Sequence, residues 1–113
     1  MKLDRIKMDN FIEEGLKEYR KNGKSEYFKT ICKQVIETQD PVTNYLFARE
    51  VPTCFVKAHV YVVNKFGTDE IIYKYATEIQ GADISEAKQA LKKRASYKLL
   101  KQLVYETTPI NEL

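Results

Sequence analysis

Apolar residues recur through most of the chain at the spacing of an amphipathic α-helix, about 3.6 residues per turn. Glycine and proline break this pattern at short intervals, where helices usually end or restart. The pattern predicts no strand. It predicts six or seven helices, over residues 3–21, 25–39, 41–51, 53–66, 69–80, 84–94 and 97–106.

Capping residues precede three of these segments. Ser25 stands before the second, and a serine hydroxyl can accept a hydrogen bond from a free N–H of the first turn. Asp40 and Pro41 combine an N-cap carboxylate with a proline at the first helical position, where no N–H is missed. Asp83 followed by Glu86 resembles a capping box. These residues predict where three of the helices begin.

The chain also repeats itself with a period of 28 residues. The segment YLFAREV at 45–51 returns as YKYATEI at 73–79, with Tyr, Ala, Glu and an aliphatic residue at the same offsets. Glu78 returns again as Glu106. Helical periodicity alone could align apolar residues at this distance, which is roughly eight turns, but it would not return the other residues as a set. Each repeat is therefore interpreted as one αα-hairpin.

The repeat settles the segment HVYVVNKF at 59–66, whose β-branched residues alone would favour a strand. The corresponding segments, CKQVIETQ and KQALKKRA, are helical in composition, so we predict helix here as well. The same period places large residues in a ladder that stacked units would bury: Tyr19, Phe47, Tyr75 and Leu103.

We therefore predict an all-α fold of stacked helical hairpins, a short α-solenoid-like array, forming one domain over residues 1–113. A content of 43% hydrophobic residues is enough for a core. Within this domain, residues 1–40 are expected to form a divergent N-terminal cap, 41–106 the repeat units, and 107–113 a flexible tail.

The string YKYATEIQGADISEAKQALKK resembles the Y-x-F-A-x-x-V-x-G-A-D-I helical repeats of uncharacterised bacterial and phage-related proteins. The matching residues are Tyr73, Ala76, Ile79, Gly81, Ala82, Asp83 and Ile84, and in the first half of the preceding unit Tyr45, Phe47, Ala48 and Val51. That unit departs from the pattern where Pro-Thr-Cys-Phe at 52–55 replaces Gly-Ala-Asp. The resemblance implies an all-helical stacked fold, and it implies no activity and no site residues.

Charge is mild overall, because 19 basic and 16 acidic residues give a net charge of +3. This value does not by itself indicate a nucleic-acid-binding protein. The excess lies near the C-terminus, in a run of basic residues with no acid between them: Lys88, Lys92, Lys93, Arg94, Lys98 and Lys101. A hairpin could bring them to one edge, where they would contact phosphates in a salt-dependent way. The alternative is that they only solvate a terminal unit and favour helix C-termini.

The same region admits a helix-turn-helix interpretation, with YATEIQG as the first helix and turn and ISEAKQALKK as the recognition helix. The alanine and glycine lie one residue away from their usual places in that motif. The repeat already accounts for the glycine, so we favour the repeat.

Residues suited to catalysis are sparse. His59 is the only histidine, and its place among valines indicates a packed imidazole bonded to a backbone carbonyl rather than a general base. Cys32 and Cys54 lie in apolar helical patterns and are predicted to be buried free thiols. Their spacing fits no zinc pattern, and the glycines form no phosphate loop. We therefore expect no enzyme, no metal site and no cofactor.

Three tyrosines, Tyr61, Tyr97 and Tyr105, fall outside the ladder and are expected on the surface. Tyrosine is favoured at protein interfaces because it buries a large area at low entropic cost. We therefore expect a non-catalytic protein-binding module, such as a phage- or mobile-element-encoded inhibitor or adaptor acting on a cellular protein. The alternative is nucleic-acid binding through the basic edge from Lys88 to Lys101.

The N-terminal residues carry a charge at every second or third position, so we expect neither a secretory segment nor a membrane span, and a cytoplasmic location. The partner and the oligomeric state are left open.

Overall fold

The computed structural model describes residues 4–108, and this part of the chain contains seven α-helices and no strand. The all-α prediction is confirmed, including a helix over the valine-rich segment. In chain order the helices are α1 (Arg5–Asn22), α2 (Glu26–Glu37), α3 (Pro41–Glu50), α4 (Val56–Phe66), α5 (Asp69–Glu78), α6 (Ile84–Lys93) and α7 (Tyr97–Thr107). Of the predicted tail at 107–113, Thr107 is the last residue of α7, and residues 109–113 lie outside the described residues, as does the predicted helix start at Leu3.

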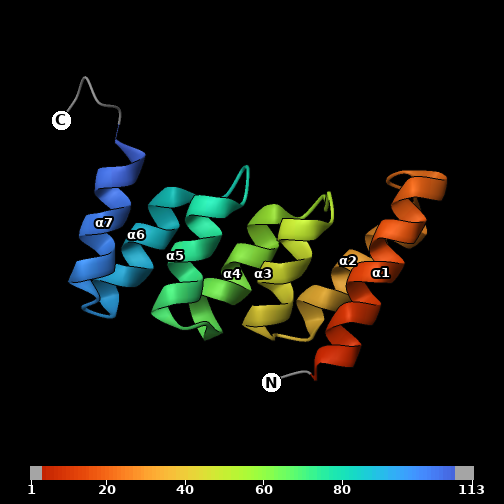
Figure 1. Ribbon diagram of the computed structural model, residues 1–113, viewed down its shortest axis with the longest axis horizontal. Helices are drawn as coiled ribbons and strands as arrows, with labels where there is room; N and C mark the ends of the chain where they lie inside the picture. Colours follow the sequence, from red (N-terminus) through yellow and green to blue (C-terminus); the bar gives the residue numbers. More distant parts are fainter. Residues whose placement is uncertain (1–3, 109–113) are drawn as a thin grey trace.

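The helices form two layers (Figure 1). We call α1, α3, α5 and α7 the odd layer, and α2, α4 and α6, which lie behind them in this view, the even layer. Within residues 4–108, each helix packs only against helices one or two places away along the chain. The molecule measures 45 × 32 × 18 Å, and its shortest dimension corresponds to two helices of about 10 Å each. The predicted stack of helical hairpins is confirmed.

Helix boundaries follow the predicted caps. The Ser25 hydroxyl accepts a hydrogen bond from the N–H of Phe28, and the Asp40 carboxylate accepts one from Thr43 at 2.8 Å. Asp83 accepts one from the N–H of Glu86 at 3.1 Å. Each bond satisfies one N–H of a first turn, which has no partner inside the helix.

The loop before α4 differs from the prediction. A helix from Thr53 was expected, but α4 begins at Val56, and residues 52–55 connect it to α3. Cys54 lies in this loop and is exposed, so its prediction as a buried residue was wrong. Cys32 is buried as predicted, and burial raises the pKa of its thiol.

Helix starts keep a spacing of 28 residues from α3 onward. The odd-layer helices α3, α5 and α7 begin at Pro41, Asp69 and Tyr97, and α4 and α6 begin at Val56 and Ile84. In contrast, α1 spans 18 residues and follows no such spacing. A repeat that unites sequence and structure stays an interpretation of these spacings.

The core consists of two clusters. The first, around Phe28, joins α1, α2 and α3, and the second, around Tyr75, extends from α3 to α7. Three residues of the predicted ladder, Phe47, Tyr75 and Leu103, are fully buried, whereas Tyr19 is 36% exposed at the end of the stack. The ladder therefore crosses both clusters.

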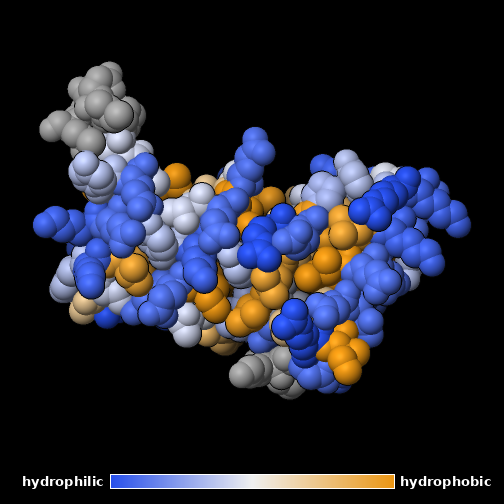
Figure 2. Space-filling model, in the orientation of Figure 1, coloured by the Kyte–Doolittle hydropathy of each residue, from blue (hydrophilic) through white to orange (hydrophobic). Residues whose placement is uncertain are grey.

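Side chains on the odd-layer face are unevenly distributed. Figure 2 shows hydrophilic side chains over the α7 and α1 ends, with apolar side chains reaching the surface between them, over α3 and the adjoining edges of α1 and α5. None of the helices in the described part of the chain combines the length and apolar character needed to cross a bilayer.

Candidate functional site

A buried polar network joins three segments next to Phe47. His59 is fully buried, with Nδ1 2.7 Å from Asn44 Oδ1 and Nε2 3.0 Å from Thr53 Oγ1. The Asn44 amide group donates to the backbone carbonyls of Val35 at 3.1 Å and of Asp40 at 2.8 Å. His59 is therefore packed as predicted, but the expected backbone carbonyl partner is wrong, since both of its partners are side chains.

The environment of His59 indicates a structural role. Burial lowers its pKa from 6.5 to about 4, so the imidazole is neutral at pH 7. It is closed off from solvent, and its two nitrogens are occupied by Asn44 and Thr53. The network thus holds α2, α3 and α4 together rather than presenting a base to a ligand.

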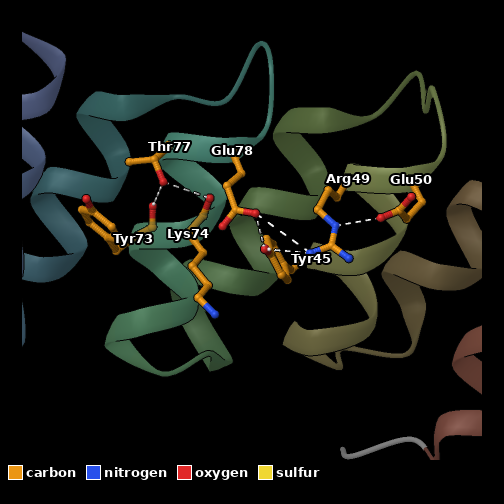
Figure 3. Close-up of polar contacts among 7 residues, drawn as sticks. All are labelled: Tyr45, Arg49, Glu50, Tyr73, Lys74, Thr77 and Glu78. Atoms are coloured by element: carbon orange, nitrogen blue, oxygen red, sulfur yellow. Dashed lines mark hydrogen bonds and ion pairs between the residues drawn. The ribbon is translucent and has the colours of Figure 1, made fainter.

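Polar side chains on the odd layer also bind one another, as Figure 3 shows. The Tyr45 hydroxyl donates to Glu78 Oε1 at 2.7 Å, which links α3 to α5. The Arg49 guanidinium lies 5.4 Å from the Tyr45 ring centroid. One period further, the Tyr73 hydroxyl donates to Glu106, which links α5 to α7 in the same way. These side chains connect neighbouring helices of the stack.

A groove in the even layer has different properties. It lies between α4 and α6, has a volume of about 470 Å³, and we call it the α4–α6 groove. It brings together one predicted interface residue, Tyr61, and two predicted nucleic-acid residues, Lys93 and Arg94. The full lining is Tyr61, Asn64, Lys65, Glu86, Gln89, Ala90, Lys93 and Arg94.

Arg94 closes the end of α4. Its guanidinium donates to the backbone carbonyls of Asn64 at 2.9 Å and Gly67 at 2.5 Å, and to Asp69 Oδ1 at 3.3 Å. Carbonyls of a last helical turn have no partner inside the helix, so Arg94 satisfies them from the next unit. This structural role was missed from the sequence, because no local pattern shows that Arg94 reaches residues about a period earlier.

The lysines of the groove, by contrast, are left without acidic partners. The Lys65 Nζ lies 5.7 Å from the centroid of the Tyr61 ring and 5.3 Å from that of Phe66. Lys93 stands one period after Lys65, at the end of α6, and within residues 4–108 neither lysine forms an ion pair. The two helices carry five lysines and one acid, Glu86, so the potential around the groove is positive.

The other predicted residues lie on the last hairpin. Tyr97 and Tyr105 are exposed on α7. Lys88 is half-buried and Lys92 exposed on α6, whereas Lys98 and Lys101 are exposed on α7. The predicted basic edge is thus divided between the two layers, and only Lys93 and Arg94 line the groove with Tyr61.

No group of three His, Cys, Asp or Glu side chains in residues 4–108 is close enough to hold a metal ion. The chain matches no protein-family model, no curated protein and no solved structure. The candidate site therefore rests on geometry and charge.

Proposed function

We propose that this protein is a non-catalytic binding module that recognises another protein through exposed tyrosines. The observation that supports this best is the exposure of Tyr61, Tyr97 and Tyr105, at 61%, 63% and 68%. Each ring leaves apolar area in water that a partner could bury, while its hydroxyl stays available for hydrogen bonds. A stack of hairpins also offers an extended surface of the kind that repeat proteins use for binding.

A phage- or mobile-element-encoded inhibitor or adaptor of a cellular protein is the form of this function that we favour. The support is the resemblance of residues 73–93 to repeats of bacterial and phage-related proteins. Such a protein needs a stable surface and no reaction chemistry of its own.

The test is affinity capture from cell extract with the full chain, followed by identification of the retained protein and measurement of its affinity. Replacing Tyr61, Tyr97 and Tyr105 by Ala is expected to weaken the partner at least about tenfold, as loss of interface anchors does. Tyr27→Ala is the matched control, since Tyr27 is also 53% exposed but lies on α2. Unchanged affinity in the triple variant, with helical content retained by circular dichroism, would contradict the proposal.

Nucleic-acid binding is the second candidate, and the exposure of Lys92, Lys93, Lys98 and Lys101 supports it. A phosphate-driven contact weakens steeply as salt rises, whereas a tyrosine-centred interface responds little. Titration of the protein into labelled single- and double-stranded DNA at low and physiological salt tests this. Replacing Lys92, Lys98 and Lys101 by Gln should then abolish binding.

A further inference from the structure

Three features of the α4–α6 groove have no partner within residues 4–108. Lys65 and Lys93 form no ion pair there, and the Tyr61 ring is 61% exposed. The third is Asn64, whose Oδ1 atom is shielded from solvent and receives no hydrogen bond. A buried acceptor without a donor costs about 1–3 kcal/mol, so the groove gains when a ligand supplies one.

We propose that the α4–α6 groove binds an acidic peptide segment of a partner protein, whose carboxylates contact Lys65 and Lys93. This inference rests on the proposed protein-binding function and specifies its surface and the chemistry of its partner.

The charges of the groove select an acidic partner. Lys65 and Lys93 occupy the same position of successive even-layer helices, one period apart. Packed helices lie about 8–10 Å apart, so these ammonium groups stand on opposite walls of the groove. Arg94 already satisfies the last carbonyls of α4, which leaves the lysines free for a ligand. Successive side chains of an extended peptide point to opposite sides, so two adjacent acidic residues would reach both walls.

The hydrogen-bonding groups favour a peptide over a nucleic acid. A peptide backbone carries N–H donors that Asn64 Oδ1 lacks within the chain, whereas a phosphodiester backbone offers acceptors only. Gln89 adds a second amide to the lining, and Glu86 would repel a continuous polyanion. The exposed Tyr61 ring can pack against an apolar side chain of the peptide.

The test uses the isotopically labelled full chain and amide chemical-shift mapping. The probe is a short synthetic peptide with adjacent glutamates and one leucine, and its control has glutamine in place of every glutamate. We expect the acidic peptide to shift amides of α4 and α6 and the glutamine peptide to leave them unchanged. Absence of shifts in α4 and α6 at millimolar acidic peptide would overturn the inference.

Matched charge variants localise the effect. Lys65→Gln with Lys93→Gln is expected to weaken the peptide at least about tenfold, as expected when close charge pairs are lost. Lys17→Gln with Lys74→Gln changes the net charge equally on exposed odd-layer sites and should alter affinity less than about twofold. Equal weakening by both pairs would show a non-specific charge effect and contradict the proposed groove.

Single-stranded oligothymidine is the third probe. Tighter binding of the oligonucleotide than of the acidic peptide at the same amides would replace the peptide with nucleic acid as occupant. If the groove fails all probes while the Tyr-to-Ala variant still loses a captured partner, the protein-binding function stands and its surface lies on α7.

Discussion

At the scale of single residues, the His59 network shows how one unit of the stack differs from the next. Asn44 and His59 occupy the positions that Ile72 and Ala87 hold one period later, and all four side chains are buried. An apolar contact is thus replaced by a hydrogen-bonded one that also reaches the carbonyl of Val35 in α2. Because an unpaired polar group would be costly, the network favours a single register of α2 against α3 and α4.

The buried imidazole predicts a dependence of stability on pH. The pKa of His59 is about 4 in the folded chain and 6.5 in the reference state, so the unfolded chain binds more protons between these values. The contribution of His59 is complete above pH 6.5 and is lost as the pH falls toward 4. The difference in free energy of unfolding is about 3 kcal/mol.

Urea unfolding of the wild type and of His59→Gln at pH 7.5, 5.5 and 4.5 measures this contribution. The variant should be less stable at neutral pH but lose less stability on acidification. Carboxylates titrate in both proteins, so they cancel in the comparison. Parallel pH profiles of the two proteins would contradict the assigned role of His59.

Residues also mark the limit of prediction from sequence. Ser25 and Asp40 were predicted correctly as caps, because capping depends on bonds within one helical turn. Cys54 was wrong, since the loop at 52–55 breaks the helical pattern that placed it inside. Arg94 was missed, because its hydrogen bonds to Gly67 and Asn64 depend on the packing of α6 beside α4.

At the scale of elements, the turn between α6 and α7 contains a residue in an unfavourable conformation. Ala95 has a φ of 57°, which costs an L-residue about 1–2 kcal/mol compared with right-handed backbone. Ala95→Gly is expected to raise the free energy of unfolding by about 0.5–1 kcal/mol, after the entropy that glycine adds to the unfolded chain.

The same substitution inside a helix is the control for Ala95. Ala58→Gly, in the first turns of α4, should lower stability by about 1 kcal/mol because glycine is a poor helix former. Denaturant unfolding of both variants gives the two signs. A loss of stability in Ala95→Gly would show that the turn does not strain the chain.

The contact between α1 and α3 depends on a glycine. A Cβ at Gly15 would lie 3.0 Å from the Cε2 atom of Phe47 and 3.4 Å from Val51 Cγ1. Gly15→Leu should therefore separate the helices and cost about 1–3 kcal/mol, as overpacked cores do. Glu13→Leu, an exposed change on the same helix, should stay within about 0.5 kcal/mol of the wild type. Thermal unfolding compares the two, and equal effects would mean that α1 does not pack tightly at Gly15.

At the scale of the whole molecule, the order of the helices was predictable and the binding groove was not. The period of 28 residues follows from sequence, and it placed Lys65 and Lys93 at equal offsets, a signal that could have indicated a shared surface. The groove itself depends on how Ala90, Gln89 and Tyr61 fill the space between two helices. Such packing is a property of the assembled layers and has no local pattern.

The stack also predicts how the molecule unfolds. Helices in residues 4–108 contact only neighbours one or two places away, and the core is divided between the clusters around Phe28 and Tyr75. In such an array, stability is approximately a sum of local terms. Leu103 is fully buried in the second cluster, so Leu103→Ala should cost about 2–5 kcal/mol there.

Native-state hydrogen exchange of Leu103→Ala and of Phe28→Ala resolves the two ends of the stack. Leu103→Ala should lower the opening free energy of α5, α6 and α7 while the amides of α2 keep most of their protection. Phe28→Ala should have the reverse effect, because its cluster includes residues of α1, α2 and α3. If either substitution lowers protection equally in every helix, the chain unfolds as one cooperative unit and the description as a nearest-neighbour array is wrong.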